Sequence, residues 1–250
     1  MRFVIKIAYD GTNYAGWQRQ KNAVSVQQRL EEAVFLATGK AVSVTASGRT
    51  DAGVHALGQV CHFDAESITV PAEKMPECLN RFLPDDIRVM QGWQAKEGFD
   101  SNRSAKRKTY CYRLYASNKD NPLLSRYAVR IENMPSVACL REKAKLFEGE
   151  HDFKAFCASG SSVKTTVRTV YEVKIEEEII FGVKAIGVYV TGNGFLYNMV
   201  RTMIGELIEL ASERKSQESL MEAYRTGERN LLGKTMPAKG LTLVNVDYNE

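Results

Sequence analysis

The stretch VRTVYEVKIEEEIIFGVKAIGVYV, residues 167 to 190, predicts two strands that follow each other without a helix between them. One strand is expected near 167–177 and the other near 181–190. A doubly wound parallel sheet alternates strand with helix, whereas consecutive strands pair as antiparallel neighbours. The stretch therefore favours the α+β class, with a mixed or antiparallel sheet.

The rest of the chain supplies further strands and helices around this pair. Strands are predicted near 3–9, 42–46, 57–63, 87–93, 108–115 and 240–248. Helices are predicted near 25–38, 72–82, 136–147, 195–211 and 217–225. The first helix has the clearest ends, because Ser25 can cap it, Gln28 stands at the capping-box position and Gly39 can stop it.

A chain of 250 residues is long for one core, so two lobes are expected. The boundary falls between 94 and 107, which gives an N-terminal lobe at 1–100 and a C-terminal lobe at 101–250.

Composition narrows the class of protein. Hydrophobic residues make up 44% and charged residues 26%, values typical of a folded globular chain. The five cysteines are widely spaced and form no C-x-x-C pair, so neither a disulfide framework nor a zinc site is predicted, and reduced thiols are expected. The opening MRFVIKIAYDG alternates like a strand, and no apolar run approaches the roughly 20 residues of a membrane span. We expect a cytoplasmic location and no membrane association.

The motif GRTDAGVH, residues 48 to 55, contains the first candidate functional residues. In an extended backbone Arg49 and Asp51 project to the same side, so they can pair, and a guanidinium beside a carboxylate keeps it ionised. A structural ion pair at a turn and a nucleophilic aspartate both fit these residue types.

The three histidines, at 55, 62 and 151, lack metal-ligand spacing. His55 is a candidate general acid or base, and a hydrogen-bonded structural histidine is the favoured alternative.

A basic segment with aromatics follows the predicted lobe boundary. From Ser101 to Arg113 there are five cations and no acids, and Tyr110 and Tyr112 share one face of the following strand. Exposed tyrosines stack on nucleic-acid bases, and cations beside them contact phosphates, whereas core packing is the usual fate of a strand tyrosine. Both interpretations fit the pair. For Tyr14 and Trp17, anchoring of their loop to the core is the favoured interpretation.

The helix near 195–211 carries a buried apolar stripe, and Asn198 and Arg201 fall together off it. An arginine on the flank of a buried helix needs solvent or an anionic partner. A solvated surface arginine is the favoured interpretation, and Asp51 is a candidate anionic partner.

Two glycine patterns resemble phosphate-binding loops without meeting their requirements. TGNGFLYN, residues 191 to 198, has Tyr197 where a dinucleotide-binding fingerprint needs its last glycine. GERNLLGKT, residues 227 to 235, has five residues between its glycines where a P-loop has four, and it follows a helix. Neither a nucleotide hydrolase nor a nucleotide cofactor is predicted.

Six motifs, taken in order, resemble the tRNA pseudouridine synthase A (TruA) family. They are IAYDGTNYAGWQRQ (7–20), SVQQRLEEA (25–33), GRTDAGVHALGQV (48–60), RKTYCYRLY (107–115), GNGFLYNMVRTMIGEL (192–207) and GLTLVNVDY (240–248). The resemblance implies two ferredoxin-like, RRM-like lobes that share a central, mostly antiparallel sheet with helices on one face and an active-site cleft between the lobes. It also implies a cofactor-free, metal-free isomerase that acts as a homodimer and converts uridines 38, 39 and 40 of the tRNA anticodon arm to pseudouridine.

The resemblance assigns roles to particular residues. Asp51 matches the nucleophilic aspartate, and Arg201 matches the arginine that pairs with it. Arg49 matches an arginine that helps to fill the space left by a flipped base, and Tyr110 matches the tyrosine that stacks on that base. The cations expected to hold tRNA phosphates are Arg103, Lys106, Arg107 and Lys108. A tRNA-binding protein without catalytic activity is the alternative from another functional class.

Overall fold

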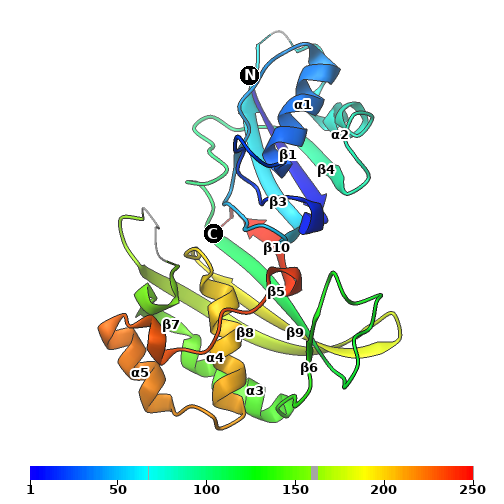
Figure 1. Cartoon of the computed structure of the whole chain (residues 1–250). Helices are drawn as coiled ribbons and strands as arrows, with labels where there is room; N and C mark the ends of the chain where they lie inside the picture. The colour runs from blue at the N-terminus through cyan, green and yellow to red at the C-terminus, as the bar shows by residue number, and fades with distance from the viewer. Residues whose placement is uncertain (67, 159–162, 250) are drawn as a thin grey trace. The chain divides into compact units, whose positions relative to one another are not determined.

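A computed structural model of the chain describes residues 1–66, 68–158 and 163–249 and divides into two compact units (Figure 1). The first unit comprises Met1–Lys106 together with the C-terminal segment from Thr242, and the second comprises Arg107–Leu241. The division differs from the expected linear one at residue 100, because the chain returns to its first unit for its last strand.

The first unit is built on a mostly antiparallel sheet. Its strands are β1 (Arg2–Tyr9), β2 (Thr45–Ala46), β3 (His55–Asp64), β4 (Ile87–Gln94) and β10 (Leu241–Asp247). β1 lies between β4 and β3 and is antiparallel to both, whereas β10 joins β3 in parallel. β2 pairs with β3 in antiparallel fashion. The helices α1 (Val26–Thr38) and α2 (Met75–Leu79) lie on one face of this sheet (Figure 1).

The ends of α1 follow the predicted signals. The Ser25 hydroxyl accepts a hydrogen bond from the backbone N–H of Gln28 at 3.2 Å, and Gly39 ends the helix in the left-handed conformation with φ 70°. The capping box does not close, because the Gln28 side chain donates to Glu32 instead of reaching back to Ser25.

Two predicted elements of the first unit are shorter than expected, in both cases because a side chain bonds the backbone. The strand predicted at 42–46 is reduced to β2, since Gln27 and Glu31 of α1 bond the carbonyl and N–H of Val44. The helix predicted at 72–82 becomes a 3-10 turn followed by α2. Beyond it the Asn80 amide pairs with the N–H and carbonyl of Val89 in β4.

Four strands of the second unit form an antiparallel series, and a fifth strand pairs with it in parallel. In spatial order the series is β5 (Arg107–Ala116), β9 (Val183–Gly192), β8 (Val167–Ile180) and β7 (Gly149–Asp152), and β6 (Val129–Ile131) pairs in parallel with β5. β8 and β9 form the hairpin predicted from residues 167–190. The α+β class and the mostly antiparallel pairing are confirmed.

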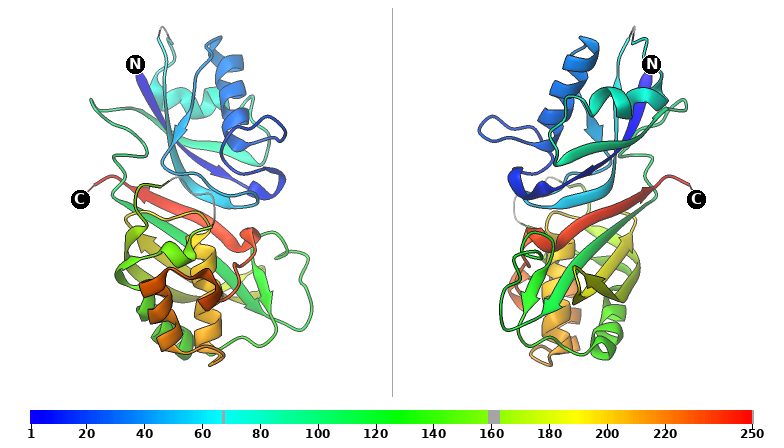
Figure 2. Two further views of the ribbon diagram at one scale, coloured as in Figure 1. Left: turned by 60° about the vertical axis from the view of Figure 1, so that its left-hand side comes forward. Right: turned by 90° about the vertical axis from the view of Figure 1, so that its right-hand side faces the viewer.

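The helices of the second unit are α3 (Val137–Ala144), α4 (Met199–Ala211) and α5 (Gln217–Thr226). Figures 1 and 2 show them together on one side of the strands of this unit. The helix predicted from Phe195 begins only at Met199, because Asn198 adopts a left-handed conformation with φ 64° and ψ 0°. Within the described residues, no helix is both long enough and apolar enough to cross a bilayer.

Candidate active site

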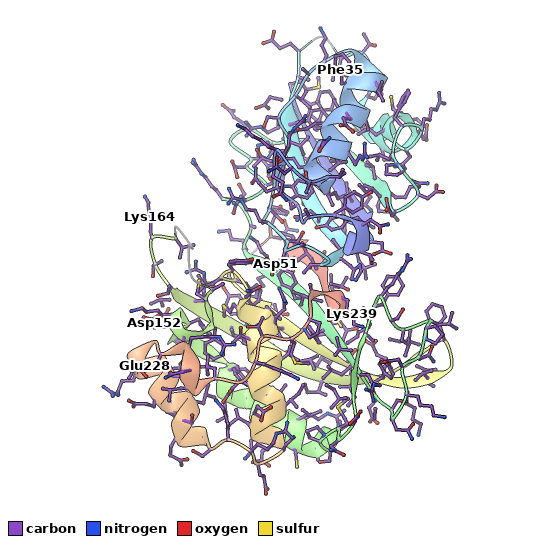
Figure 3. All side chains as sticks on the ribbon, in the orientation of Figure 1. Phe35, Asp51, Asp152, Lys164, Glu228 and Lys239 are labelled. Atoms are coloured by element: carbon purple, nitrogen blue, oxygen red, sulfur yellow. The ribbon has the colours of Figure 1, made fainter. Side chains whose placement is uncertain are left out.

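Asp51 lies in the loop that leads from β2 into β3 (Figure 3). Its neighbours in the loop are fastened to the core on both sides. Before it, the Thr50 hydroxyl is 2.8 Å from the hydroxyl of Tyr9 in β1, and Thr50 is buried. After it, the N–H of Val54 donates to the Asp51 carbonyl at 3.1 Å and closes a turn. The half-buried Asp51 is thus presented by a backbone with little freedom to move.

A second loop, residues 10–17, supports the Asp51 loop through its backbone. The N–H of Trp17 donates to the Thr50 carbonyl at 3.0 Å, and the N–H of Gly53 donates to the Tyr14 carbonyl at 3.3 Å. Gly16 has φ +88°, and a Cβ on it would lie 2.6 Å from the Thr50 carbonyl oxygen. Only glycine allows this approach, so the motifs DGTNYAG and GRTDAG form one structure.

The aromatic residues of that second loop anchor it, as the favoured interpretation of the sequence predicted. Trp17 is 2% exposed and Tyr14 6% exposed. The Tyr14 hydroxyl donates to Asp86 at 2.5 Å, and burial together with this bond raises the pKa of Tyr14.

Buried polar groups hold the start of the Asp51 loop. The Ser47 hydroxyl donates to the Gln59 side chain at 2.5 Å, and the Gln59 amide donates to the Gly48 carbonyl at 2.8 Å. Ser47 and Gln59 are both fully buried. Because a buried polar group must find a partner, these bonds select one path for the chain before Arg49.

The predicted ion pair between Arg49 and Asp51 is not formed. Arg49 is exposed, and within the described part of the chain its guanidinium has no ion-pair partner. The prediction assumed an extended backbone, but a bend at 47–48 and the turn at 52–53 flank the two residues, so the alternation of a strand does not apply.

The first two histidines serve the structure of the first unit. His55 is 4% exposed, and its Nδ1 lies 3.1 Å from both the Gly11 nitrogen and an Asp10 carboxylate oxygen; either contact alone occupies that nitrogen. His62 accepts a hydrogen bond from the buried Ser101 N–H at 3.1 Å, and burial lowers its pKa. The structural interpretation of His55 is supported.

The third histidine lies in the second unit. His151 stacks on Tyr224 with ring centroids 4.3 Å apart.

Tyr110 and Tyr112 of β5 are both buried, but their surroundings differ. Tyr112 is fully buried, and its hydroxyl donates to the Pro237 carbonyl at 2.7 Å, so it belongs to the core and cannot stack on a base. Tyr110 is 7% exposed, and the ring of Phe195 meets it edge-on with centroids 5.3 Å apart. Phe195 thereby holds the Tyr110 ring in a defined orientation.

Arg201, on the first turn of α4, is held by two groups of its own unit. Its Nε donates to the Met236 carbonyl at 2.7 Å, and a terminal nitrogen donates to the Asn198 side chain at 2.7 Å. The expectation of a solvated surface arginine is therefore wrong, because the side chain is half-buried and oriented.

The basic segment contains cations of two kinds. Arg103, Lys106 and Arg107 are exposed, and the Arg107 guanidinium lies 4.9 Å from the Tyr171 ring centroid. Lys108 is half-buried instead, and burial, together with the positive charge of Arg168, lowers its pKa to about 8.

Three features of the second unit are not predicted from the sequence. Arg168 on β8 is half-buried, and burial lowers its pKa. No sequence motif identifies it. Asn198 was recognised beside Arg201, but its left-handed backbone was not. The segment Gly233–Met236 was considered only as a phosphate-loop lookalike, whereas it packs along α4.

The described residues contain no group of three or more His, Cys, Asp or Glu side chains placed to hold a metal ion. The groups available for chemistry in the assigned positions are a carboxylate, arginines, a lysine and a phenol. A carboxylate can supply a nucleophile or base, a phenol can supply a stacking surface, and arginines and a lysine can supply positive charge for an anionic substrate.

Comparison with known proteins identifies the class. The profile of a family described as "tRNA pseudouridine synthase" matches residues 5–97 and 144–249. The protein is therefore an isomerase of the pseudouridine synthase class that acts on tRNA.

Full-length relatives narrow the class further. A tRNA pseudouridine synthase A from Thermoanaerobacter sp. (strain X514) is 40% identical over 98% of both chains. Those from Acetivibrio thermocellus and Anoxybacillus flavithermus are each 40% identical, over 97% and 99% of both chains. The chain belongs to the tRNA pseudouridine synthase A family.

Proposed function

We propose that this enzyme converts uridines 38, 39 and 40 of the tRNA anticodon arm to pseudouridine, with Asp51 as its nucleophile. The observation that carries the proposal is the backbone support of Asp51 by residues 10–17. A carboxylate that must meet one atom of a bound nucleotide needs a defined position, and a misplacement of about 1 Å can cost on the order of 100-fold in rate.

The reaction moves the ribose from N1 to C5 of the uracil ring. The glycosidic bond between C1′ and N1 breaks, the base turns within the site, and C5 bonds to C1′ while its proton leaves. The Asp51 carboxylate assists by attacking C1′, by adding to C6 of the base, or by removing the C2′ proton to give a glycal. Each route requires an ionised Asp51, and each ends with loss of the C5 proton.

The remaining proposed residues prepare the substrate. A base inside a stem must be flipped out at a cost of a few kcal/mol, and we assign Arg49 to the vacated space. Its exposure and its lack of an ion-pair partner among the described residues support this role. Tyr110, held by Phe195, stacks on the flipped uracil. As the family resemblance implies, Arg201 pairs with the Asp51 carboxylate.

Phosphates of the anticodon arm are held by the basic segment, Arg103, Lys106, Arg107 and Lys108. The exposure of the first three supports this assignment. We further propose that the enzyme is a cytoplasmic homodimer that requires no cofactor, as the family resemblance implies.

Tritium release from tRNA that carries C5-tritiated uridine tests the proposal, with native protein compared with Asp51→Asn and no metal or nucleotide added. We expect release by the native protein and none by the variant, with tRNA affinity retained. Release by both proteins at equal rates would remove Asp51 from the nucleophile's role. Tight tRNA binding without release by either would favour a binding protein.

A further inference from the structure

The segment Gly233–Met236, here called the strap, is fastened to α4 along its length. At one end the N–H of Met236 donates to the Arg201 carbonyl at 3.2 Å, and Arg201 Nε donates back to the Met236 carbonyl at 2.7 Å. In the middle, the hydroxyls of Thr202 and Thr235 lie 3.0 Å apart. The position of the strap therefore determines the position of the Met236 carbonyl, which orients Arg201.

The other end of the strap is held by Glu206. Its Oε2 accepts a hydrogen bond from the N–H of Gly233 at 2.5 Å, and the residue is 0% exposed. One residue earlier, a Cβ on Gly205 would lie 1.9 Å from the Lys234 carbonyl oxygen, so the strap lies directly on the helix. An alanine at this position would lift the strap from α4.

Glu206 is an unfavourable residue to bury at this position. Its second oxygen, Oε1, has no hydrogen-bond partner within the described residues, and the Lys215 Nζ that forms an ion pair with Glu206 is 3.9 Å from Oε2. Burial raises the pKa of the Glu206 carboxyl. An apolar residue would pack here without these penalties, but the Gly233 N–H would then be buried without an acceptor.

We propose that Glu206 is a positioning residue for uridine isomerisation, which holds the strap at Gly233 so that the Met236 carbonyl orients Arg201. The inference rests on the proposed function, because it assigns significance to the orientation of Arg201. Glu206 itself does not touch the substrate. Its effect passes through a short, continuous series of contacts along one face of α4.

Two variants of Glu206 separate its acceptor oxygen from its charge. Glu206→Gln keeps an oxygen that can accept from Gly233, whereas Glu206→Leu removes it at similar volume. We expect the single-turnover rate of tritium release to fall on the order of 10- to 100-fold in Glu206→Leu with tRNA affinity unchanged, and to be largely restored in Glu206→Gln. A native rate in folded Glu206→Leu would overturn the proposal.

Leu124→Ala is the matched control for lost stability. Leu124 is fully buried in a separate small cluster of the same unit, with Tyr115, Ala128 and Ala185. This variant should lower the melting temperature while keeping the native single-turnover rate. A rate loss in Leu124→Ala that matches Glu206→Leu at equal loss of melting temperature would reduce Glu206 to a structural role and overturn the proposal.

Two further variants keep the outcome decisive. Thr202→Val removes the middle contact of the strap at nearly constant volume, and it should also lower the rate of tritium release. It replaces Glu206→Leu as the test if that variant does not fold. Arg201→Gln tests the step on which the inference rests. If Arg201→Gln loses activity but Glu206→Leu and Thr202→Val do not, the positioning proposal fails alone. If native protein releases no tritium, the proposed function fails first.

Discussion

Lys106 and Lys108 are two positions apart in one basic segment, yet their surroundings give them different chemistry. Lys106 is exposed, whereas Lys108 is half-buried with a pKa lowered to about 8. In the protein without bound tRNA, Lys108 therefore begins to lose its charge at mildly alkaline pH. A phosphate that binds it favours the charged form and raises its pKa again.

Affinity for tRNA should therefore fall as the pH rises through about 8. Below that value Lys108 is charged in both states and contributes no pH dependence. At one pH unit above it, about a tenth of the Lys108 side chains remain charged in the absence of tRNA, so affinity should drop by up to roughly tenfold. Binding titrations at constant ionic strength between pH 7 and 9 would measure this. The slope should vanish in Lys108→Met and persist in Lys106→Met, and a flat native profile would contradict the assignment.

At the scale of elements, two loops that are distant in sequence support each other at Asp51. The contact is made by backbone atoms on both sides, which leaves no room for a side chain at Gly16. Gly39 is a useful comparison, because it also has a positive φ, but a Cβ on it would meet no described atom within 4 Å. An alanine at Gly39 would therefore introduce backbone strain alone, whereas an alanine at Gly16 would introduce both strain and a steric collision.

Gly16→Ala should cost more stability than Gly39→Ala, and it alone should affect catalysis. Gly39→Ala should lose about 1–2 kcal/mol from the left-handed backbone conformation. Gly16→Ala adds the collision with the Thr50 carbonyl, which shifts the Asp51 loop and should lower the rate on the order of 10- to 100-fold. Urea unfolding and tritium release would measure both effects. Equal losses of stability and of rate in the two variants would mean that the contact between the two loops does not position Asp51.

Element boundaries were predictable where a local signal decided them and not elsewhere. Ser25 and Gly39 bound α1 as expected, since capping depends on neighbours in the chain. The late start of α4 at Met199 could not be foreseen, because a left-handed Asn198 competes with a helical one at small cost and its contact with Arg201 contributes to the outcome. The short β2 has a similar cause in the side chains of α1 that bond Val44.

At the scale of the whole molecule, the C-terminal segment makes the first unit discontinuous in sequence. β10 pairs in parallel with β3, the strand that follows the Asp51 loop, through Thr242↔His55 and Leu243↔Ala56. The Tyr248 hydroxyl donates to the Ser101 carbonyl at 2.7 Å near the end of the unit's first segment. Because the unit needs both segments, its stability depends on residues from both ends of the chain.

The proposed homodimer gives a prediction for the intact protein in solution. Sedimentation equilibrium should return about 56 kDa, which is twice the chain mass of 28.0 kDa, at concentrations used for activity assays. The same measurement on Asp51→Asn is the control, since a change in a loop carboxylate should leave assembly unaltered. A mass near 28.0 kDa for a fully active sample would exclude the dimer as the working form.

The amino-acid sequence by itself determined the α+β class, most elements and the family, because consecutive strands, helix caps and ordered motifs are local patterns. It also placed Asp51, Tyr110 and Arg201 among the candidates. Only the tertiary structure decided that Arg49 does not pair with Asp51, that Tyr112 is core, and that the Gly233–Met236 strap orients Arg201. The reason is physical: local patterns record what a residue prefers, whereas pairing and burial depend on what packing elsewhere in the chain brings beside it.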